Sequence, residues 1–386
     1  MAITFGSGVN FSEELTYTTK VTRIDDTHFV VVYYEQPNGI KAKIGTITGA
    51  NTVTYGAQNN VIAVNSSIRA VTMLDSTHVA IAYKAPSTDN SSLIIGSISG
   101  ETITFGSSST LFSTNSYVSG MEALSSTSLA VAYKDNIALV MKMVIVTISG
   151  TSITGYGTHY TYDSSDGNGG SLSKLSSTKL TITYTNSLSD GYCRTANVSG
   201  ANISFGTPYL FYDATSSCNT WASVGLDETH FAFSYFTNAT YLPTSVRIGT
   251  VSGDSISYGA EYQFAYSGSN VNGMDSITSS SFGLVYKDAG SSRGYATTCS
   301  VANGNEITVA TPQIFSNSID SNYMNICTNS VTALVMTAAV PNHATGLVGN
   351  IPPPTSVKSI NGLARASVKS IKGLAIASVK SWNGLA

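Results

Sequence analysis

A short motif recurs along the chain, and this internal repeat constrains the fold more than any other feature. Copies of an Ile-Thr-Phe-Gly-like motif start near residues 3, 53, 103, 153, 203, 256 and 307, so the unit is about 50 residues long. Repeats of this length are typical of solenoids and propellers, because one unit cannot bury its apolar face alone and has to stack on its neighbours. The seven units end near residue 350.

Each unit is expected to contain four short antiparallel strands. The segment Leu74–His78 (Leu-Asp-Ser-Thr-His) predicts a tight turn before a strand over 79–83, and the Gly in Ile98–Glu101 predicts a hairpin back into the next Ile-Thr-Phe-Gly strand. The chain is rich in Ser, Thr, Gly, Asn and Tyr, residues that favour strands and tight turns over helices.

The strand that follows the turn has one large face and one small face. The large residues are Phe29, Val31, Tyr33; Val79, Ile81, Tyr83; Leu129, Val131, Tyr133; Leu180, Ile182, Tyr184; Phe231, Phe233, Tyr235; and Phe282, Leu284, Tyr286. Between them lie mostly small residues: Ala80, Ala82; Ala130, Ala132; Thr181, Thr183; Ala232, Ser234; and Gly283, Val285. Because alternate residues of a strand point to opposite faces, we predict that the large face of one sheet packs on the small face of its neighbour. A linear solenoid would also stack its units, but four antiparallel strands per unit fit a propeller blade better.

The sequence therefore predicts an all-β fold, a seven-bladed β-propeller over residues 1–350. A Pro-rich linker at 351–355 and a tail at 356–386 follow it. The chain begins on the motif that ends a blade, so we expect the N-terminal strand to complete the last blade and leave no unpaired sheet at the seam.

The tail contains a second repeat of 11 residues: Val357–Ala364, Val368–Ala375 and Val379–Ala386. An 11-residue period also suits a right-handed helical supercoil. Each copy nevertheless centres on Asn-Gly or Lys-Gly, which favours short strands joined by two-residue turns. The predicted assembly residues are Val357, Ile360, Leu363, Val368, Ile371, Leu374, Val379, Trp382 and Leu385.

The tail and the predicted ring have net charges of opposite sign. The net charge of −3 divides into −8 for the body and +5 for the tail, which has five basic residues and no acidic one. A basic, apolar, strand-forming tail on an acidic ring predicts docking to another copy of the chain or to another virion or fibre protein. Docking in cis and in trans both stay open, and the alternative is a partly disordered appendage.

Composition excludes several classes of function. The chain has no basic surplus that would indicate nucleic-acid binding, and it has no run of about 18 apolar residues that would span a membrane. Met1–Gly6 has neither a basic nor an apolar signal region, so we expect no secretory signal in this chain. The cysteines Cys193, Cys218, Cys299 and Cys327 lie far apart without CxxC spacing. They predict buried free thiols rather than a metal or redox site, with one disulfide left open.

Two repeated side chains are interpreted as structural. His28, His78 and His230 occupy one turn position in different units, so they lie too far apart to form a metal site and predict turn chemistry. The strand that follows the turn ends in a tyrosine in six units: Tyr33, Tyr83, Tyr133, Tyr184, Tyr235 and Tyr286. These tyrosines could form a multivalent lectin set, but each completes an apolar face and is interpreted as a packing residue.

Candidate sites are few. Trp221 has no equivalent in the other units and is the candidate for a sugar-binding residue. Asp163, Asp166 and Asn168 lie in an irregular segment and could offer oxygen ligands to Ca²⁺, although their spacing matches no known calcium loop. The acidic residues lie mostly in the repeated turns, and HExxH and phosphate-binding Gly-rich motifs do not occur. We therefore expect no catalytic residue, no metal and no cofactor.

Three segments carry a resemblance to a known group. They are Gly249–Gly259 (Gly-Thr-Val-Ser-Gly-Asp-Ser-Ile-Ser-Tyr-Gly), Ala132–Asp135 (Ala-Tyr-Lys-Asp) and Val285–Asp288 (Val-Tyr-Lys-Asp). These units resemble a repeat of tailed-bacteriophage proteins, and the Val-Lys-Ser-Ile-Asn-Gly-Leu-Ala tail is similar to C-terminal decorations of phage and extracellular fibre-like proteins. The resemblance covers nearly the whole chain and implies a virion or surface-fibre component, but no catalytic residues.

The sequence thus predicts a non-enzymatic structural or adhesive protein of a phage virion appendage or extracellular fibre that assembles through its tail. One alternative is a multivalent lectin that attaches to host-surface glycans. Another is a polysaccharide-degrading enzyme, which would need a cluster of acidic residues at the mouth of the channel.

Overall fold

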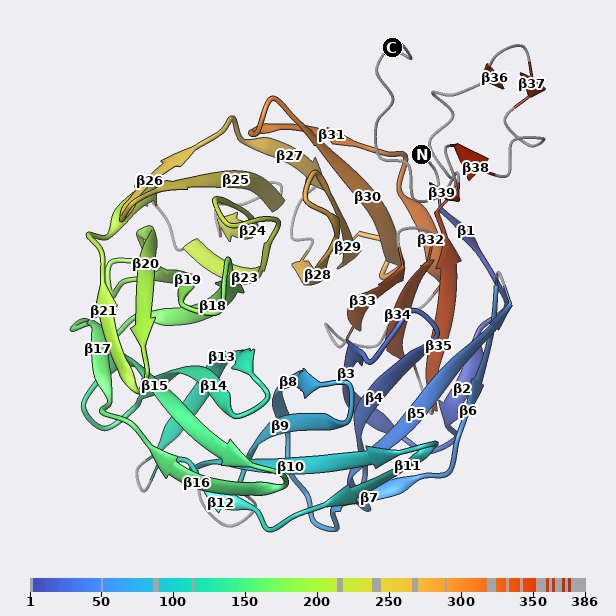
Figure 1. The fold of residues 1–386 in the computed structure, drawn as a ribbon, viewed down its shortest axis with the longest axis horizontal. Helices are drawn as coiled ribbons and strands as arrows, with labels where there is room; N and C mark the ends of the chain where they lie inside the picture. The colour runs from blue at the N-terminus through green and yellow to red at the C-terminus, as the bar shows by residue number, and fades with distance from the viewer. Residues whose placement is uncertain are drawn as a thin grey trace.

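The computed structural model describes the ring and part of the tail. The described residues are 3–49, 51–85, 90–112, 115–213, 218–237, 244–265, 270–288, 290–317, 324–330, 333–340, 343–351, 359–360, 363–364, 370–371 and 374–375. They are all-β, and no helix that could cross a membrane occurs among them. Seven sheets are arranged radially around a central axis (Figure 1). The seven-bladed propeller is therefore confirmed.

Blade 1 shows the common plan. Its strands are β3 (Thr16–Arg23), β4 (His28–Glu35), β5 (Gly39–Gly49), β6 (Thr52–Tyr55) and β7 (Asn59–Ile62). Both β6 and β7 pair with β5, so the outer strand of the blade consists of two short pieces. The four strands expected per unit are present, with the outermost one interrupted.

The other blades repeat this plan. Blade 2 is β8 (Ile68–Asp75), β9 (His78–Lys84), β10 (Ser91–Ser99), β11 (Thr102–Phe105) and β12 (Ser109–Thr110); blade 3 is β13 (Ser116–Ser125), β14 (Ser128–Asp135), β15 (Val140–Ser149), β16 (Ser152–Tyr156) and β17 (Tyr160–Asp163). Blade 4 is β18 (Asn168–Lys174), β19 (Lys179–Thr185), β20 (Gly191–Ser199), β21 (Asn202–Phe205) and β22 (Tyr209–Tyr212); blade 5 is β23 (Cys218–Gly225), β24 (His230–Thr237), β25 (Thr244–Ser252), β26 (Ser255–Tyr258) and β27 (Tyr262–Ala265). Blade 6 is β28 (Asn270–Thr278), β29 (Ser281–Lys287), β30 (Gly294–Ala302), β31 (Glu306–Val309) and β32 (Gln313–Ser316).

Blade 7 joins the two ends of the ring. Its strands are β33 (Met324–Ser330), β34 (Ala333–Val340) and β35 (His343–Asn350), and the N-terminal β1 (Thr4–Phe5) and β2 (Val9–Ser12) pair antiparallel with β35. The innermost strands contact one another in an unbroken circle, from β3 through β8, β13, β18, β23 and β28 to β33 and back to β3. Closure by the N-terminal strand is confirmed.

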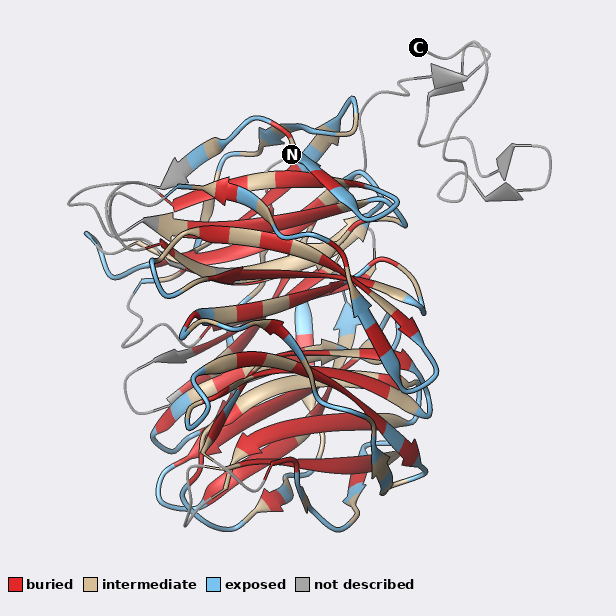
Figure 2. Ribbon diagram, turned by 90° about the vertical axis from the view of Figure 1, so that its left-hand side faces the viewer, coloured by how far each residue is buried: buried red, intermediate tan, exposed pale blue. Residues whose placement is uncertain are grey.

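Packing between blades follows the predicted alternation. Ala80 and Ala82 of blade 2 share a buried cluster with Leu129, Val131 and Tyr133 of blade 3. The same arrangement joins blades 3 and 4 and blades 5 and 6. Between blades 1 and 2, Val30 and Val32 take the place of the small residues and pack on Val79 and Ile81. Figure 2 shows buried residues along the strands and exposed ones at the connections. Close packing of this kind lets one blade fill the space that its neighbour leaves.

The two faces of the ring differ in their connections. One, here called the turn face, has the short turns between the innermost and second strands (24–27 in blade 1) and the hairpins between the third and outer strands. In four of these hairpins a Gly has φ between +55° and +61°, as at Gly100, where a side chain would be disfavoured. The opposite face, called the loop face, has the connections between the second and third strands (36–38 in blade 1) and those that lead to the next blade (63–67 after blade 1).

In the tail, strand pairing is described for the first two repeats. Strand β36 (Ser359–Ile360) pairs antiparallel with β37 (Leu363–Ala364), and β38 (Ser370–Ile371) pairs with β39 (Leu374–Ala375). Each pair is separated by two residues, as the expected two-residue turns require. The third repeat, the linker from Pro352 on and all side chains of the tail lie outside the described residues.

Candidate functional site

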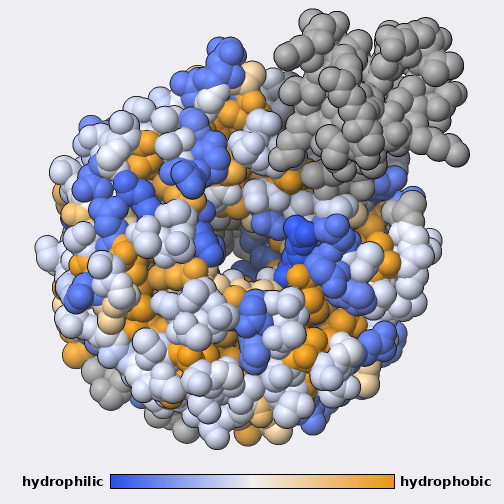
Figure 3. Space-filling model, viewed as in Figure 1, coloured by the Kyte–Doolittle hydropathy of each residue, from blue (hydrophilic) through white to orange (hydrophobic). Residues whose placement is uncertain are grey.

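The innermost strands surround a central channel that is open in the space-filling view, with hydrophilic residues at parts of its rim (Figure 3). Within it lies a cavity of about 340 Å³, lined by residues of β3, β8, β13, β28 and β33. A concave, polar space bounded by several blades is the best candidate for a ligand site on the described part of the ring.

One repeat position distinguishes the blades along this channel. In the strand registers it is occupied by Thr22, Thr72, Glu122, Ser173, Val224, Asp275 and Cys327. Acidic residues occur there only in blades 3 and 6, and both Glu122 and Asp275 line the cavity. The sequence interpretation missed this pair. An alignment of the units at this strand would have shown two acids where the other blades have neutral residues.

The environment of the channel favours the protonated form of both carboxyls. Burial raises the pKa of Glu122 to about 7; Lys174 opposes the shift and Asp275 adds to it. Burial also raises the pKa of Asp275 to about 6, although hydrogen bonds from Thr328 and Ser276 and the charge of Arg23 favour ionisation. Both groups can therefore exchange a proton near neutral pH and can accept hydrogen bonds from a polar ligand.

Asp275 also has a structural contact. Its Oδ2 accepts a hydrogen bond from the Thr328 N–H at 2.6 Å, and in the next pair of blades Asn325 Oδ1 accepts one from the Val21 N–H at 3.3 Å. Backbone groups on the inner edge of one blade are thus satisfied by side chains of the preceding blade. Asp275 is held in place by this contact.

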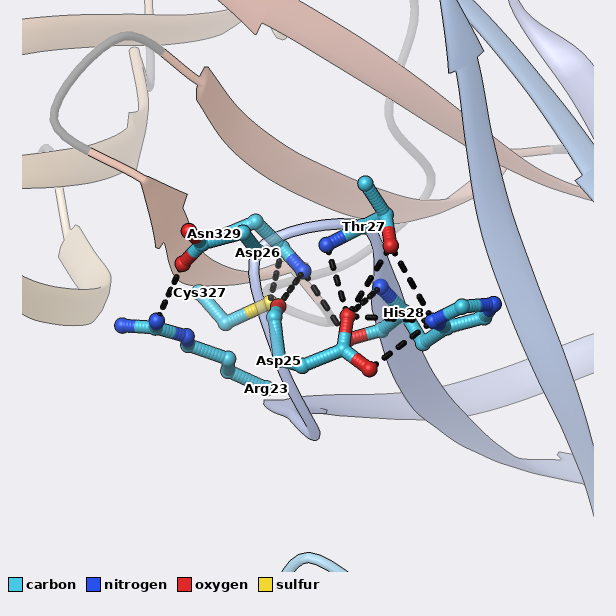
Figure 4. A network of polar contacts seen from close by, with 7 residues as sticks. All are labelled: Arg23, Asp25, Asp26, Thr27, His28, Cys327 and Asn329. Atoms are coloured by element: carbon cyan, nitrogen blue, oxygen red, sulfur yellow. Dashed lines mark hydrogen bonds and ion pairs between the residues drawn. The ribbon is translucent and has the colours of Figure 1, made fainter.

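The seam between blades 7 and 1 contains a buried polar residue (Figure 4). Asn329 is fully buried, and its Nδ2 donates to the carbonyl oxygens of Asp25 and His28, both at 2.9 Å. The other six blades have Ile24, Leu74, Leu124, Leu175, Leu226 and Ile277 at this position, directly after the inner-strand residue that pairs with Phe29 or with its equivalent in the other blades. The ring is therefore joined at its seam by directed hydrogen bonds as well as by apolar packing.

The repeated histidines belong to the turn itself. Asp25 Oδ1 accepts from the Thr27 N–H at 2.7 Å and the His28 N–H at 2.8 Å, and the His28 ring lies against the same carboxylate (Figure 4). The same contacts recur in the turn of blade 5. In blade 2 the Thr77 N–H and the His78 ring contact Asp75 in the same way. Burial works against ionisation of Asp25, but the hydrogen bonds from Thr27 and His28 outweigh it and lower its pKa to about 2. Turn chemistry is confirmed.

The calcium candidates have separate partners. Asp163 Oδ1 accepts from the Ser165 N–H at 2.7 Å, and Asp166 Oδ1 lies 2.6 Å from Lys134 Nζ. Asn168 begins β18 opposite Thr185. Over the described residues, no group of three or more His, Cys, Asp or Glu is placed to hold a metal ion.

Trp221 lies at a β-bulge of the innermost strand β23, where the register shifts between Thr220 and Ser223. Blades 2, 3 and 4 have Arg69, Ser119 and Gly170 in the corresponding bulge. The Trp221 side chain lies outside the described residues, as do those of all nine predicted assembly residues.

Two further predictions are confirmed. The tyrosines of the second strand of blades 1 to 6, Tyr33, Tyr83, Tyr133, Tyr184, Tyr235 and Tyr286, are all buried, so they pack between blades and do not form a surface lectin set. The four cysteines are free and buried, so the one disulfide that the sequence left open does not form. Burial raises the pKa of Cys193 and Cys218 to about 12, so these thiols are unreactive.

Known structures share the architecture. The WD40 domain of Toxoplasma gondii coronin matches with a TM-score of 0.55 at 10% identity, covering 91% of this chain and 88% of that one. The Dos1 propeller matches with a TM-score of 0.53 at 11% identity (89% and 95% covered), and the C-terminal WD40 domain of Sif2 with 0.51 at 12% identity (90% and 99%). The chain is a WD40-like repeat β-propeller by fold. No protein-family model and no curated protein sequence matches it, and at these identities the likeness shows the fold alone.

Proposed function

We propose that this protein is a non-enzymatic, adhesive component of a phage virion appendage or extracellular fibre, in which the propeller is the folded body and residues 356–386 make the assembly contact. A WD40-like propeller fits a binding or protein-interaction role. The virion or fibre setting is supported by the resemblance of the repeats and the tail to bacteriophage proteins.

The contrast between ring and tail carries this proposal. The ring closes on itself through β1, β2 and β35. The tail strands instead form two-stranded sheets with two residues in each strand, and sheets of this size are marginal in water on their own. The repeated Val, Ile, Leu and Trp positions of the tail therefore require a partner surface.

Charge supports the same role. The tail has five basic residues and no acidic one, and the rest of the chain has 14 basic and 22 acidic residues. Opposite charge on ring and tail speeds and orients their association, and salt weakens this contribution.

Sedimentation velocity on full-length and truncated chains tests the proposal. Removing residues 356–386 is expected to abolish assembly and to leave the thermal unfolding of the propeller unchanged. A full-length control with I360D, I371D and W382D, one substitution per tail repeat, is expected to behave like the truncated chain. If either chain still assembles, the proposal is wrong.

A second candidate function is glycan binding in the central channel, supported by the cavity and by the carboxyls of Glu122 and Asp275. Carboxylates that face a polar cavity can accept hydrogen bonds from sugar hydroxyls. A glycan array with wild type and E122Q tests it. Binding that E122Q weakens supports the channel site, and an array without hits refutes it.

A further inference from the structure

Exposed apolar side chains gather on the loop face. Of the ten large apolar residues with exposed side chains among the described residues, seven lie there: Leu15, Tyr17, Val64, Tyr117, Ile137, Leu139 and Leu188. Four of them belong to the adjacent blades 3 and 4, with exposed fractions of 46% for Tyr117, 68% for Ile137, 48% for Leu139 and 75% for Leu188. We call these four residues the blade 3–4 patch. Single exposed apolar residues are common, but a group on neighbouring loops indicates an interaction site.

Polar contacts tie together the loops that carry the patch. Lys134 at the end of β14 pairs with Asp166 in the β17–β18 connection at 2.6 Å. The Ser187 N–H, next to Leu188, donates to Ser165 Oγ in that same connection at 3.2 Å. The loop after β14 and the loop after β19 therefore flank one segment and form a continuous surface.

Leu139 has an unusual backbone for an exposed residue. Its φ is +55°, a left-handed conformation that is unfavourable for a residue with a Cβ. Gly or Asn would occupy this position of the hairpin at lower cost. A leucine whose side chain is 48% exposed nevertheless occupies it, which supports a role in contact with a partner.

The charge of these loops suits one occupant. Lys142 pairs with Asp135 at 2.9 Å, Lys134 pairs with Asp166 at 2.6 Å, and the Arg69 guanidinium lies 4.1 Å from the centre of the Tyr117 ring. Asp163 and Asp190 both lie near Tyr192 and leave these loops with a net negative charge. The tail is basic throughout and repeats Val, Ile or Trp, and Leu every 11 residues. Apolar groups on an acidic surface complement apolar groups on a basic strand pair.

Topology places the patch far from the point where the tail leaves its own ring. Strand β35 runs from the loop face to the turn face, so the chain leaves blade 7 on the turn face. The patch lies on the loop face of blades 3 and 4, which are three blades away from blade 7 in either direction. A second copy can present its patch to the tail without the tail having to cross its own ring.

We propose that the blade 3–4 patch is the docking surface for the C-terminal tail of a second copy of this chain. The contact joins different surfaces of the two copies, so it is heterologous and propagates head to tail, as in a fibre. This inference rests on the proposed function and names the receptor surface that it requires.

The test uses full-length chains with one half of the contact removed. The patch variant is I137D/L188D, and the tail variant is I360D/I371D/W382D. The matched control is L15D/I314D, which changes two aliphatic residues exposed by 37% and 41% outside blades 3 and 4, one in the connection before β3 and one in β32 of blade 6. Sedimentation velocity as a function of concentration and salt measures assembly, and circular dichroism verifies the fold of each variant.

Each variant alone is expected to assemble at least about thirtyfold more weakly than wild type, as loss of central apolar contacts implies. A mixture of the patch and tail variants retains one intact tail and one intact patch, so it is expected to form heterodimers and nothing larger. The control is expected to assemble like wild type.

Other outcomes separate this inference from the proposed function. If the patch variant assembles like wild type while the tail variant does not, the tail docks elsewhere; this inference is then overturned and the proposed function stands. If the tail variant assembles normally, both fail. If the control is as defective as the patch variant, the patch is not specific and the inference is overturned.

A single substitution, L139G, tests the patch independently in case the double patch variant misfolds. L139G removes an exposed side chain and relieves the left-handed strain, so the ring is expected to be as stable as wild type or more so, while assembly weakens. Unchanged assembly would contradict a role for this side chain.

Discussion

Replacing Phe11 by Ala is expected to open the ring at the N-terminal clasp. Phe11 lies in β2, the N-terminal piece of the outer strand of blade 7, and it is 1% exposed. Its ring centroid lies 5.1 Å from that of Tyr33 and 5.6 Å from that of Tyr55, both in blade 1. The side chain therefore joins the clasp to the neighbouring blade.

The magnitude follows from this burial. Truncating a fully buried Phe removes its apolar contacts and leaves a cavity, which costs about 3–5 kcal/mol. With an unfolding entropy of about 2.1 cal/mol/K per residue over 386 residues, a loss of about 4 kcal/mol lowers Tm by about 5 °C. If β2 detaches from β35 before the rest unfolds, the same loss raises the opened population by up to about a thousandfold.

Phe211 provides a matched control. It occupies the equivalent outer-strand piece of blade 4, is 7% exposed, and packs on Phe233 and Tyr235 of blade 5 at 4.8 and 5.0 Å. F211A is expected to cost a similar free energy, but β22 stays covalently tethered to its own blade. Only F11A should therefore speed hydrogen exchange in β35 and β34.

Calorimetry and hydrogen-exchange mass spectrometry of both variants test this reasoning. A Tm change below about 1 °C for F11A, or equal exchange in β35 for F11A and F211A, would refute the view that the clasp closes the ring.

Three further perturbations test the seam, the turns and the channel. N329L matches the aliphatic residue of the other blades but removes two hydrogen bonds, so it should lower the free energy of unfolding by about 1–3 kcal/mol; a stabilised variant in urea denaturation would contradict the role of Asn329. The lowered pKa of Asp25 means that its contribution is present above pH 3.8 and is lost as pH falls toward about 2, so wild type should exceed D25A in stability at pH 6 and converge with it in acid. The raised pKa of Glu122 has the opposite sign, since the folded state is penalised as pH rises from 4.5 to about 7. E122Q should therefore be more stable than wild type at pH 8 and similar near pH 4, and a pH-independent difference would exclude this explanation.

Much of the architecture could be predicted because it is repeated locally. The alternation in Val79–Tyr83 recurs in six units, and each copy carries the same information about which face is large and which is small. The Asp75–His78 turn is equally local, because its hydrogen bonds join residues at most three apart. Features of this kind need no knowledge of distant contacts.

The candidate site could not be predicted in the same way. Glu122 and Asp275 come from blades 3 and 6, and only closure of the ring brings both into one cavity. Nothing in the sequence around Asn329 indicates its role, because its amide donates to two carbonyl oxygens of blade 1, about 300 residues away in the chain. The exposed residues Ile137 and Leu188 likewise form a patch only because their loops meet at Ser165 and Asp166.

The sequence alone therefore determined the number of blades, which face of each strand carries the large residues, and the opposite charges of ring and tail. Periodicity and composition are properties of short segments. The tertiary structure decided which residues face the channel, how the seam is joined and where apolar side chains remain exposed. The physical reason is that these properties depend on contacts between residues far apart in the chain, and such contacts exist only once the seven sheets have closed into a ring.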